Sequence, residues 1–320
     1  MNILITGGAG FLGRLLTRRL LADPGAAAGL SITLADVVTT DAWANDSRVR
    51  SVACDIAEAA AIAPLVTAKT GIIYHLAAVV SGQAEREFDL GMKVNLDSTR
   101  VLLELARQTR TCPQFIFTSS LAVFGGALPE VVNDQTAVTP QGSYGAAKAI
   151  GELLVNDYSR RGYVDGRVFR LPTISVRPGK PNQAASSFAS GIIREPLNGQ
   201  PAVCPVGRQL RLWLSSPRAA VANLARAAKI PGSAFGLHRT VNLPGLSVTV
   251  AEMMAALEKV AGKQTVERVK FERVEATERL VASWPGRFDL TRALALGFEG
   301  DANFETIIRH YLEDEKIVPV

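Results

Sequence analysis

Short apolar segments alternate with amphipathic segments along the first half of the chain. The apolar run Ile3-Leu4-Ile5 predicts a buried strand, and apolar side chains at helical spacing over 11–21 predict a helix directly after it. Further buried strands are expected at 30–35, 49–53, 72–78, 115–117 and 168–171, with helices at 85–107 and 143–161. Strands that alternate with helices predict an α/β fold with a Rossmann-type, doubly wound parallel sheet.

The second half of the chain has a weaker pattern. Residues 173–207 are rich in Pro, Gly, Ser and Asn and show little periodicity, as expected of loops that face a substrate. Beyond them we expect helices at 216–228, 249–261 and 304–312, and strands at 241–243 and 266–274. We therefore predict two domains: an NAD-binding Rossmann domain of residues 1–172 plus about 210–238, and a smaller C-terminal α/β substrate lobe of residues 173–209 plus 239–320.

The first predicted strand leads directly into a glycine-rich turn, Thr6-Gly7-Gly8-Ala9-Gly10-Phe11-Leu12-Gly13. Glycine permits backbone conformations that a side chain forbids, and it lets main-chain N–H groups approach a ligand closely. At the N-terminus of a helix, those groups favour an anion such as a pyrophosphate. The order of strand, glycines and helix therefore predicts a dinucleotide site, for which we expect Gly7, Gly10, Phe11, Leu12 and Gly13.

Other candidates for this site follow the next strands. Asp36 ends the second strand, where a carboxylate can accept both ribose hydroxyls and repel a 2′-phosphate, so it favours NAD over NADP. A helix cap or loop carboxylate is the alternative for Asp36. Asp55 and Ile56 follow the third strand and are placed to contact adenine. The small residues at the C-terminal end of the fourth strand leave room for the cofactor.

Two polar residues lie within predicted elements. His75 lies inside the apolar fourth strand, so we interpret it as a hydrogen-bonded core histidine rather than a catalytic one. Asn95 lies in the middle of a predicted helix, where a polar residue is unfavourable unless it bonds another group.

Ser120, Tyr144 and Lys148 form the candidate catalytic set. Ser120 follows the fifth strand, while Tyr144 and Lys148 lie on one face of a predicted helix, about 6 Å apart along its axis. A phenol titrates at about pH 10, and a neighbouring ammonium favours the phenolate, so Tyr144 can act as a base. The set predicts oxidation of an alcohol, in which Tyr144 takes the hydroxyl proton and Ser120 bonds the substrate oxygen. A surface pair is the alternative for Tyr144 and Lys148 considered alone.

The composition indicates a globular protein, with 48% hydrophobic and 20% charged residues among 320. The net charge of +5 comes from Lys and Arg scattered among acids, so we expect no nucleic-acid partner. Cys54, Cys112 and Cys204 are odd in number and widely separated, which predicts buried free thiols in a reducing compartment. The scattered His residues predict no metal site. We see no signal peptide and no membrane span, so we expect a cytoplasmic protein.

Together with Asn95 and Ser119-Ser120, these motifs resemble the extended short-chain dehydrogenase/reductase family, which includes NAD-dependent sugar epimerases and dehydratases. The resemblance covers nearly the whole chain. It implies a Rossmann domain with tightly bound NAD, and a homodimer formed through a four-helix bundle from the 85–107 and 144–161 helices. Lys148 would also hold the nicotinamide ribose hydroxyls. The cofactor set is completed by Leu76, Ala77, Ala78, Asn95, Tyr144, Lys148, Pro172 and Ile174.

Within this family, the segment Arg170-Leu-Pro-Thr-Ile-Ser-Val-Arg-Pro-Gly-Lys-Pro-Asn182 with Ser186-Ser187 resembles dehydrogenases that oxidise the C2 hydroxyl of D-erythronate to 2-keto-D-erythronate. A small aldonate needs a cation for its carboxylate and hydrogen-bonding partners for its hydroxyls. For these roles we expect Ser81, Ser120, Tyr144, Arg177, Asn182 and Ser186. A surface or interface salt bridge is an equal alternative for Arg177.

Three other functions stay open. A nucleotide-sugar 4-epimerase uses the same Ser, Tyr and Lys with NAD retained. It would need a pocket for a nucleobase and a diphosphate, for which Arg208, Arg211 and Trp213 are candidates, although the apolar surroundings of Trp213 also suit a core position. A uronate dehydrogenase is a closer variant. An NAD-sensing regulator is the non-enzymatic hypothesis, which the intact catalytic set disfavours.

Overall fold

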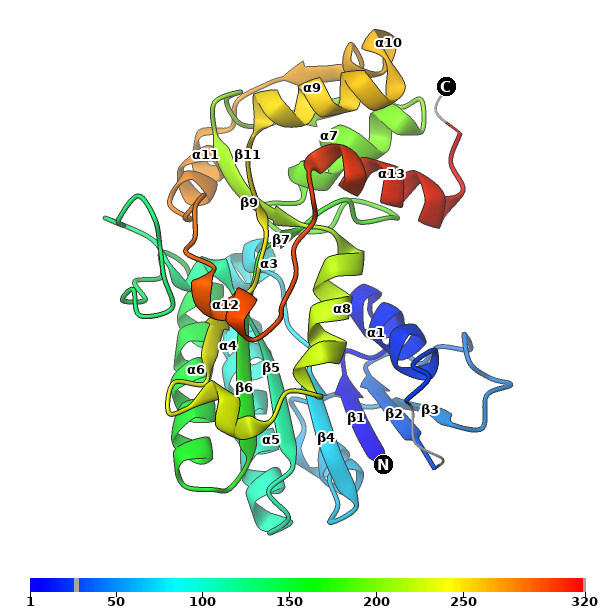
Figure 1. The fold of residues 1–320 in the computed structure, drawn as a ribbon, viewed down its shortest axis with the longest axis vertical. Coiled ribbons are helices and arrows are strands. Elements are labelled where there is room, and N and C mark those ends of the chain that lie inside the picture. Colours follow the sequence, from blue (N-terminus) through cyan, green and yellow to red (C-terminus); the bar gives the residue numbers. More distant parts are fainter. Residues whose placement is uncertain (26–28, 319–320) are drawn as a thin grey trace. The chain divides into compact units, whose positions relative to one another are not determined.

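The computed structural model describes residues 1–25 and 29–318 and divides them into two compact units (Figure 1). The first unit comprises Met1–Ser120, Gly142–Arg170 and Val221–Val241, and the second comprises Leu121–Gln141, Leu171–Ala220 and the chain from Asn242 onward. The predicted division differs mainly in the segment 121–141, which packs in the second unit, where Phe124 lies edge-on to Phe288. Residues 319–320 of the predicted substrate lobe lie outside the described residues.

Seven strands of the described chain form the central sheet of the first unit, in the order β10-β6-β5-β4-β1-β2-β3. Their bounds are β1 (Asn2–Thr6), β2 (Ser31–Asp36), β3 (Val49–Ala53), β4 (Thr70–His75), β5 (Gln114–Ser120), β6 (Asp165–Leu171) and β10 (Thr240–Asn242). β1 pairs in parallel with both β2 and β4, so the strand order reverses at β1. Such a switch point opens a crevice at the carboxyl ends of the strands. The predicted Rossmann-type sheet is confirmed.

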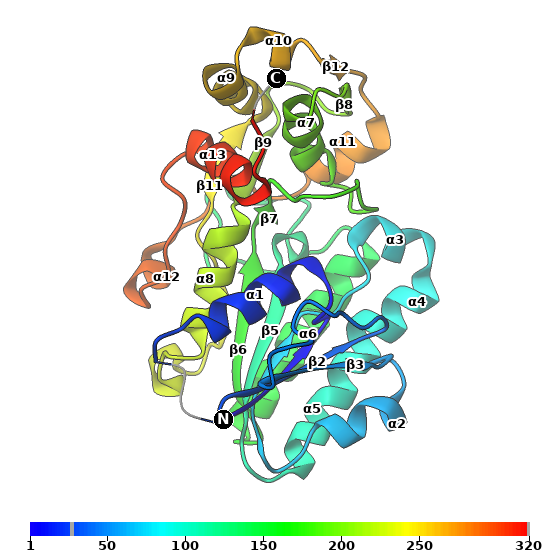
Figure 2. The same ribbon diagram turned by 90° about the vertical axis from the view of Figure 1, so that its right-hand side faces the viewer.

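Helices cover both faces of this sheet, as Figures 1 and 2 show. They are α1 (Phe11–Leu21), α2 (Ala59–Ile62), α3 (Ser81–Arg86), α4 (Phe88–Met92), α5 (Ser98–Gln108), α6 (Ser143–Arg160) and α8 (Pro217–Ala227), the last of which runs from the second unit into the first. On the face opposite α1, Leu102 and Leu103 of α5 and Val155 of α6 share a buried cluster with Phe117 of β5. This apolar layer holds α6 against the strands.

The prediction of a single helix at 85–107 is wrong. The chain leaves helical geometry at Glu87, with φ −117° and ψ 68°, and α4 then passes through a π-helical turn, η2 (Lys93–Asp97), before α5 begins. Asn95 lies in that turn, and its side-chain amide bonds the backbone of Val79. The apolar repeat continues across both irregularities, so hydrophobic periodicity alone cannot detect them.

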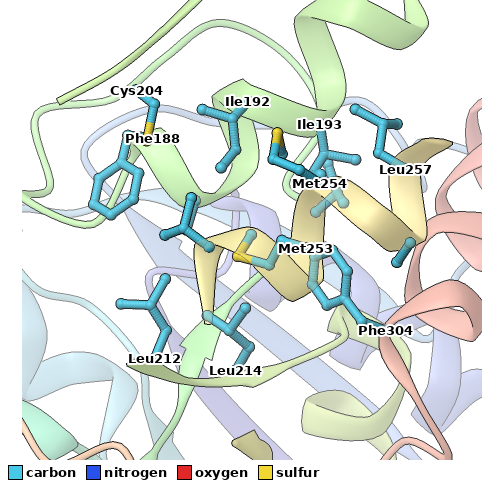
Figure 3. Packing of buried hydrophobic residues seen from close by; sticks show 14 of the residues in the cluster. Phe188, Ile192, Ile193, Cys204, Leu212, Leu214, Met253, Met254, Leu257 and Phe304 are labelled. Carbon is cyan, nitrogen blue, oxygen red and sulfur yellow. The ribbon is translucent and has the colours of Figure 1, made fainter. Parts of the chain in front are cut away.

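The second unit carries two small sheets in the described part of the chain, with the orders β11-β9-β7 and β12-β8. These strands are β7 (Thr173–Ile174), β8 (Ala202–Cys204), β9 (Arg211–Ser215), β11 (Leu246–Thr249) and β12 (Val269–Phe271). The helices are α7 (Phe188–Leu197), α9 (Val250–Ala261), α10 (Lys263–Val266), α11 (Glu275–Ala282), α12 (Thr291–Ala295) and α13 (Phe304–Glu315). Figure 3 shows their core, in which Met253 and Met254 of α9 pack with side chains of α7, β9 and α13.

Two predictions for this unit are only partly right. Residues 173–207 are loop over more than half of their length, but they also contain β7, α7 and β8. α7 is buried on most sides, so it lacks the polar face that marks an amphipathic helix. The strand predicted at 266–274 shrinks to β12, which follows directly after α10. Short elements such as these depend on their tertiary neighbours more than on local sequence.

All three cysteines lie in the described segments and are free. Cys54 and Cys204 are buried as predicted, but Cys112 is exposed, because it lies in the surface turn between α5 and β5 with φ 52°. No helix among the described residues is long and apolar enough to cross a membrane. Those residues also contain no group of three His, Cys, Asp or Glu side chains placed to hold a metal ion.

Candidate functional site

The glycine turn packs too tightly for side chains at Gly7, Gly8 and Gly13. Gly7 adopts φ +69°, and a Cβ there would lie 2.8 Å from the backbone nitrogen of Ala77 in the segment after β4. A Cβ on Gly13 would lie 2.7 Å from the Cα of Gly8 and would also overlap the carbonyl oxygen of Gly7. Gly10 precedes α1, which has no side-chain cap. The first N–H groups of the helix therefore face this turn without a side chain covering them.

Asp36 lies against the same turn. The backbone N–H of Ala9 donates to Oδ2 of Asp36 at 3.1 Å, so the carboxylate that ends β2 is held beside the glycines. Asp55 and Ile56 follow β3 as predicted. The Asp55 carboxylate accepts the N–H of Ala57 at 2.9 Å, and Ile56 is buried in the core cluster.

A chain of buried hydrogen bonds joins the glycine turn to the segment after β4. His75 lies between the hydroxyls of Thr6, at 2.8 Å from Nδ1, and Thr99, at 2.9 Å from Nε2. The Thr99 hydroxyl donates to the Asn95 carbonyl, and the Asn95 amide both accepts from and donates to the backbone of Val79. Burial lowers the pKa of His75 to about 3, so the imidazole is neutral. The interpretation of His75 as a core residue is confirmed, and Asn95 has the partner it needs.

The candidate catalytic residues all lie in the first unit. Ser120 is the last residue of β5, and Tyr144 lies in the first turn of α6, with Lys148 one turn further along. The Lys148 ammonium lies 5.7 Å from the centre of the Tyr144 ring and 4.7 Å from the centre of the Phe117 ring. The predicted shared face of Tyr144 and Lys148 is confirmed.

Lys148 is unusual because it is a buried lysine, only 1% exposed. Desolvation lowers its pKa to about 7, and the carboxylate of Glu152, one helical turn away, opposes this change. Because Lys148 is buried, the alternative that Tyr144 and Lys148 form only a surface pair is excluded. Near neutral pH its charge responds to small changes in the surroundings.

The remaining predicted site residues divide between the units. Ser81 begins α3 in the first unit. In the second unit, Pro172 directly precedes β7 and Ile174 ends it. Arg177, Asn182 and Ser186 lie in the segment that leads to α7: the Arg177 N–H donates to Ser190 Oγ, and Asn182 Oδ1 accepts from the N–H of Ala184. The cofactor roles of Pro172 and Ile174 and the substrate roles of Ser81, Arg177, Asn182 and Ser186 stay predictions.

The residues suggested for a nucleotide pocket have other contacts within the second unit. Trp213 is 6% exposed, its Nε1 donates to the carbonyl of Leu243, and its ring lies 4.9 Å from that of Phe288. Trp213 is therefore a core residue. The Arg211 guanidinium donates to the Ser247 carbonyl at 3.2 Å, and Arg208 lies over the Phe271 ring at 4.1 Å.

Glu152 is a functional candidate that the sequence motifs did not identify. This acid is 4% exposed and accepts hydrogen bonds from Arg170 and Ser119. Its position four residues after Lys148 places it on the catalytic face of α6, and that spacing could have identified it.

A parallel sheet with a bare glycine turn at its switch point, and an acid beside that turn, defines a dinucleotide-binding protein. The chain belongs to the NAD-dependent epimerase/dehydratase family, whose model matches residues 3–233. The residues fit NAD: the turn excludes Cβ atoms where a pyrophosphate needs backbone N–H groups, and Asp36 suits a ribose.

The chain is similar to two dehydrogenases over nearly its full length. It is 57% identical to the D-erythronate dehydrogenase of Cupriavidus necator, with 98% of each chain covered. It is 50% identical to the D-erythronate dehydrogenase of Haemophilus influenzae, covering 98% of this chain and 99% of that one. Among solved structures, a nucleoside-diphosphate-sugar epimerase from Agrobacterium tumefaciens matches with a TM-score of 0.93 and 46% identity, covering 99% of this chain and 94% of that one.

Proposed function

We propose that the protein oxidises the C2 hydroxyl of D-erythronate to the 2-keto acid, with NAD as cofactor. The observation that carries this proposal is the similarity to two D-erythronate dehydrogenases over nearly the whole chain. The half-buried Tyr144, the buried Lys148 beside it and Ser120 at the end of β5 supply the groups that oxidation of an alcohol requires.

In this proposal, Tyr144 takes the proton of the substrate hydroxyl as the C2 carbon–hydrogen bond breaks. When bound, NAD supplies the acceptor for the hydride that leaves C2. Lys148, while charged, favours the phenolate form of Tyr144. The Ser120 hydroxyl bonds the substrate oxygen and holds it as the bond order to C2 rises. The alcohol thus loses one proton and one hydride and becomes a ketone.

The first test is NADH formation at its absorbance band with purified protein and NAD. D-erythronate, L-threonate, a hexuronate and UDP-glucose are supplied separately. We expect NADH with D-erythronate. Formation with the hexuronate alone would assign a uronate dehydrogenase instead. Tyr144→Phe removes the base without changing the ring, so turnover should fall at least about a thousandfold while NAD still binds. Unchanged turnover would show that Tyr144 is not the base.

A nucleotide-sugar epimerase is the second candidate, and the similarity to the solved epimerase favours it. The core position of Trp213 argues against the nucleobase pocket that we considered for this activity. Interconversion of UDP-glucose and UDP-galactose, without NADH release from any acid, would favour the epimerase.

We also propose a homodimer formed through helices of the first unit. Phe88 of α4 is 56% exposed, and Ile150 and Leu153 of α6 are 40% and 67% exposed. Large apolar side chains exposed on neighbouring helices suit an interface with a second copy. Leu153→Asp should give a monomer in sedimentation velocity, whereas Leu237→Asp, at a residue 92% exposed, should leave the dimer intact. A dimer in both variants would exclude this interface.

We place the protein in the cytoplasm. Free cysteines suit a reducing compartment, and an NAD-linked dehydrogenase needs the NAD pool that the cytoplasm holds. Fractionation of cells that express the native chain tests this assignment.

A further inference from the structure

Glu152 is a buried acid in the same unit as the candidate catalytic residues. It lies on α6 one turn beyond Lys148. The Arg170 side chain, from β6, donates to it from two nitrogens: Nε to Oε1 at 2.9 Å and Nη2 to Oε2 at 2.7 Å. The Ser119 hydroxyl donates to Oε1 at 2.5 Å. Glu152, Arg170 and Ser119 are all at most 5% exposed.

A buried ion pair is weak evidence for stability, because apolar side chains of similar volume often stabilise a fold equally well. The position of this pair indicates another role. Through Ser119, Glu152 holds β5 at the residue directly before Ser120, and through Arg170 it holds β6. The same carboxylate lies on the helix that carries Tyr144 and Lys148. It therefore joins the strand end and the helix that together present the catalytic set.

The charge of Glu152 also acts on Lys148. This ammonium also faces the rings of Tyr144 on α6 and Phe117 on β5, and the neutral His75 on β4. Arg170 from β6 pairs with Glu152 itself. Glu152 thus provides the negative charge that favours the charged form of this buried lysine.

We propose that Glu152 is a positioning residue, which holds Lys148 in its charged form and fixes the strand end that carries Ser120. The inference rests on the proposed function, in which Lys148 supports the Tyr144 base. Glu152 lies one helical turn from Lys148 but two turns from Tyr144, so its charge acts on the phenol mainly through the lysine.

Glu152→Gln tests this role because it keeps the size of the side chain and removes its charge. In steady-state kinetics of the holoenzyme with D-erythronate, kcat at pH 7 should fall about tenfold, and the acid limb of the kcat profile should move upward by about one pH unit. Without the carboxylate, Lys148 loses its proton at lower pH and supports the phenolate less. The dissociation constant for NAD should change less than about threefold, because the glycine turn is untouched.

A double variant separates charge from packing. Glu152→Leu with Arg170→Met replaces the ion pair by an apolar pair, so its thermal midpoint should be at or above that of Glu152→Gln. Its acid limb should nevertheless stay displaced, since the charge is absent. If Glu152→Gln does not fold, the pH profile of the double variant tests the proposal in its place. A return of the parent pH profile in the double variant would overturn the proposal.

Glu104→Gln is the matched control, because Glu104 pairs with Arg107 at the surface of α5. It should leave kcat and its pH profile unchanged. If Glu152→Gln lowers kcat without moving the acid limb, the ion pair is only structural and the inference fails. If Tyr144→Phe keeps its turnover, the proposed function fails instead, so the two failures are distinguishable.

Discussion

The buried Lys148 predicts a specific dependence of stability on pH in the protein without cofactor. Burial lowers its pKa from 10.5 to about 7 in the folded state, whereas the unfolded chain keeps the ordinary value. Below pH 7 both states hold the proton, and the cost of burying the charge is fully present. As the pH rises from 7 towards 10.5, the unfolded state holds a proton that the folded state has lost, so stability increases.

The size of this increase follows from the same pKa values. Between pH 7 and pH 9, the difference in bound protons integrates to about 2 kcal/mol of added stability from Lys148 alone. Lys148→Met replaces the titrating side chain by an uncharged side chain of similar length. We therefore expect the parent to gain about 2 kcal/mol more than Lys148→Met over this range.

Equilibrium urea unfolding, followed by circular dichroism at pH 7, 8 and 9, measures the difference. Lys69→Met is the control, because Lys69 is an exposed residue of the same unit. Its stability should rise with pH in parallel with that of the parent. Parallel curves for the parent and Lys148→Met would refute the argument, since Lys148 would then keep an ordinary pKa in the folded protein.

Two further predictions concern the cofactor. Gly13→Ala places a methyl group against the backbone of Gly7 and Gly8, so the turn must shift, and the dissociation constant for NAD should rise at least about tenfold in a fluorescence titration. Gly191→Ala is the control, because its Cβ would meet the Glu195 side chain at an ordinary distance of 3.6 Å or more. This variant should bind NAD with the parent affinity. Equal NAD affinity in Gly13→Ala and Gly191→Ala would contradict the role of the turn. Asp36→Asn removes the charge that repels a 2′-phosphate, so the ratio of kcat/KM for NAD over NADP should fall about tenfold or more. Asp46→Asn, at a carboxylate that pairs with Arg48, should keep the parent ratio. An unchanged ratio in Asp36→Asn would remove Asp36 from cofactor selection.

The sequence by itself determined the features that depend on local spacing. The apolar runs and glycines of the first half predicted β1, α1 and the Rossmann-type sheet, because buried strands and amphipathic helices have distinct periods. The four-residue spacing of Tyr144 and Lys148 predicted one shared helix face, which α6 provides. The apolar surroundings of His75 likewise predicted a core histidine, and its two threonine partners agree with that interpretation.

Only the tertiary structure decided the features that depend on contacts between distant segments. The π-helical turn lies at Asn95, whose amide bonds Val79, and the apolar repeat shows neither that bond nor the break at Glu87. The pKa of Lys148 depends on burial by β5 and on the Glu152 charge, and the network around Glu152 joins α6 to Ser119 and Arg170 of two strands. Hydrophobic spacing predicts which elements form, whereas desolvation and pairing of buried charges depend on which elements meet.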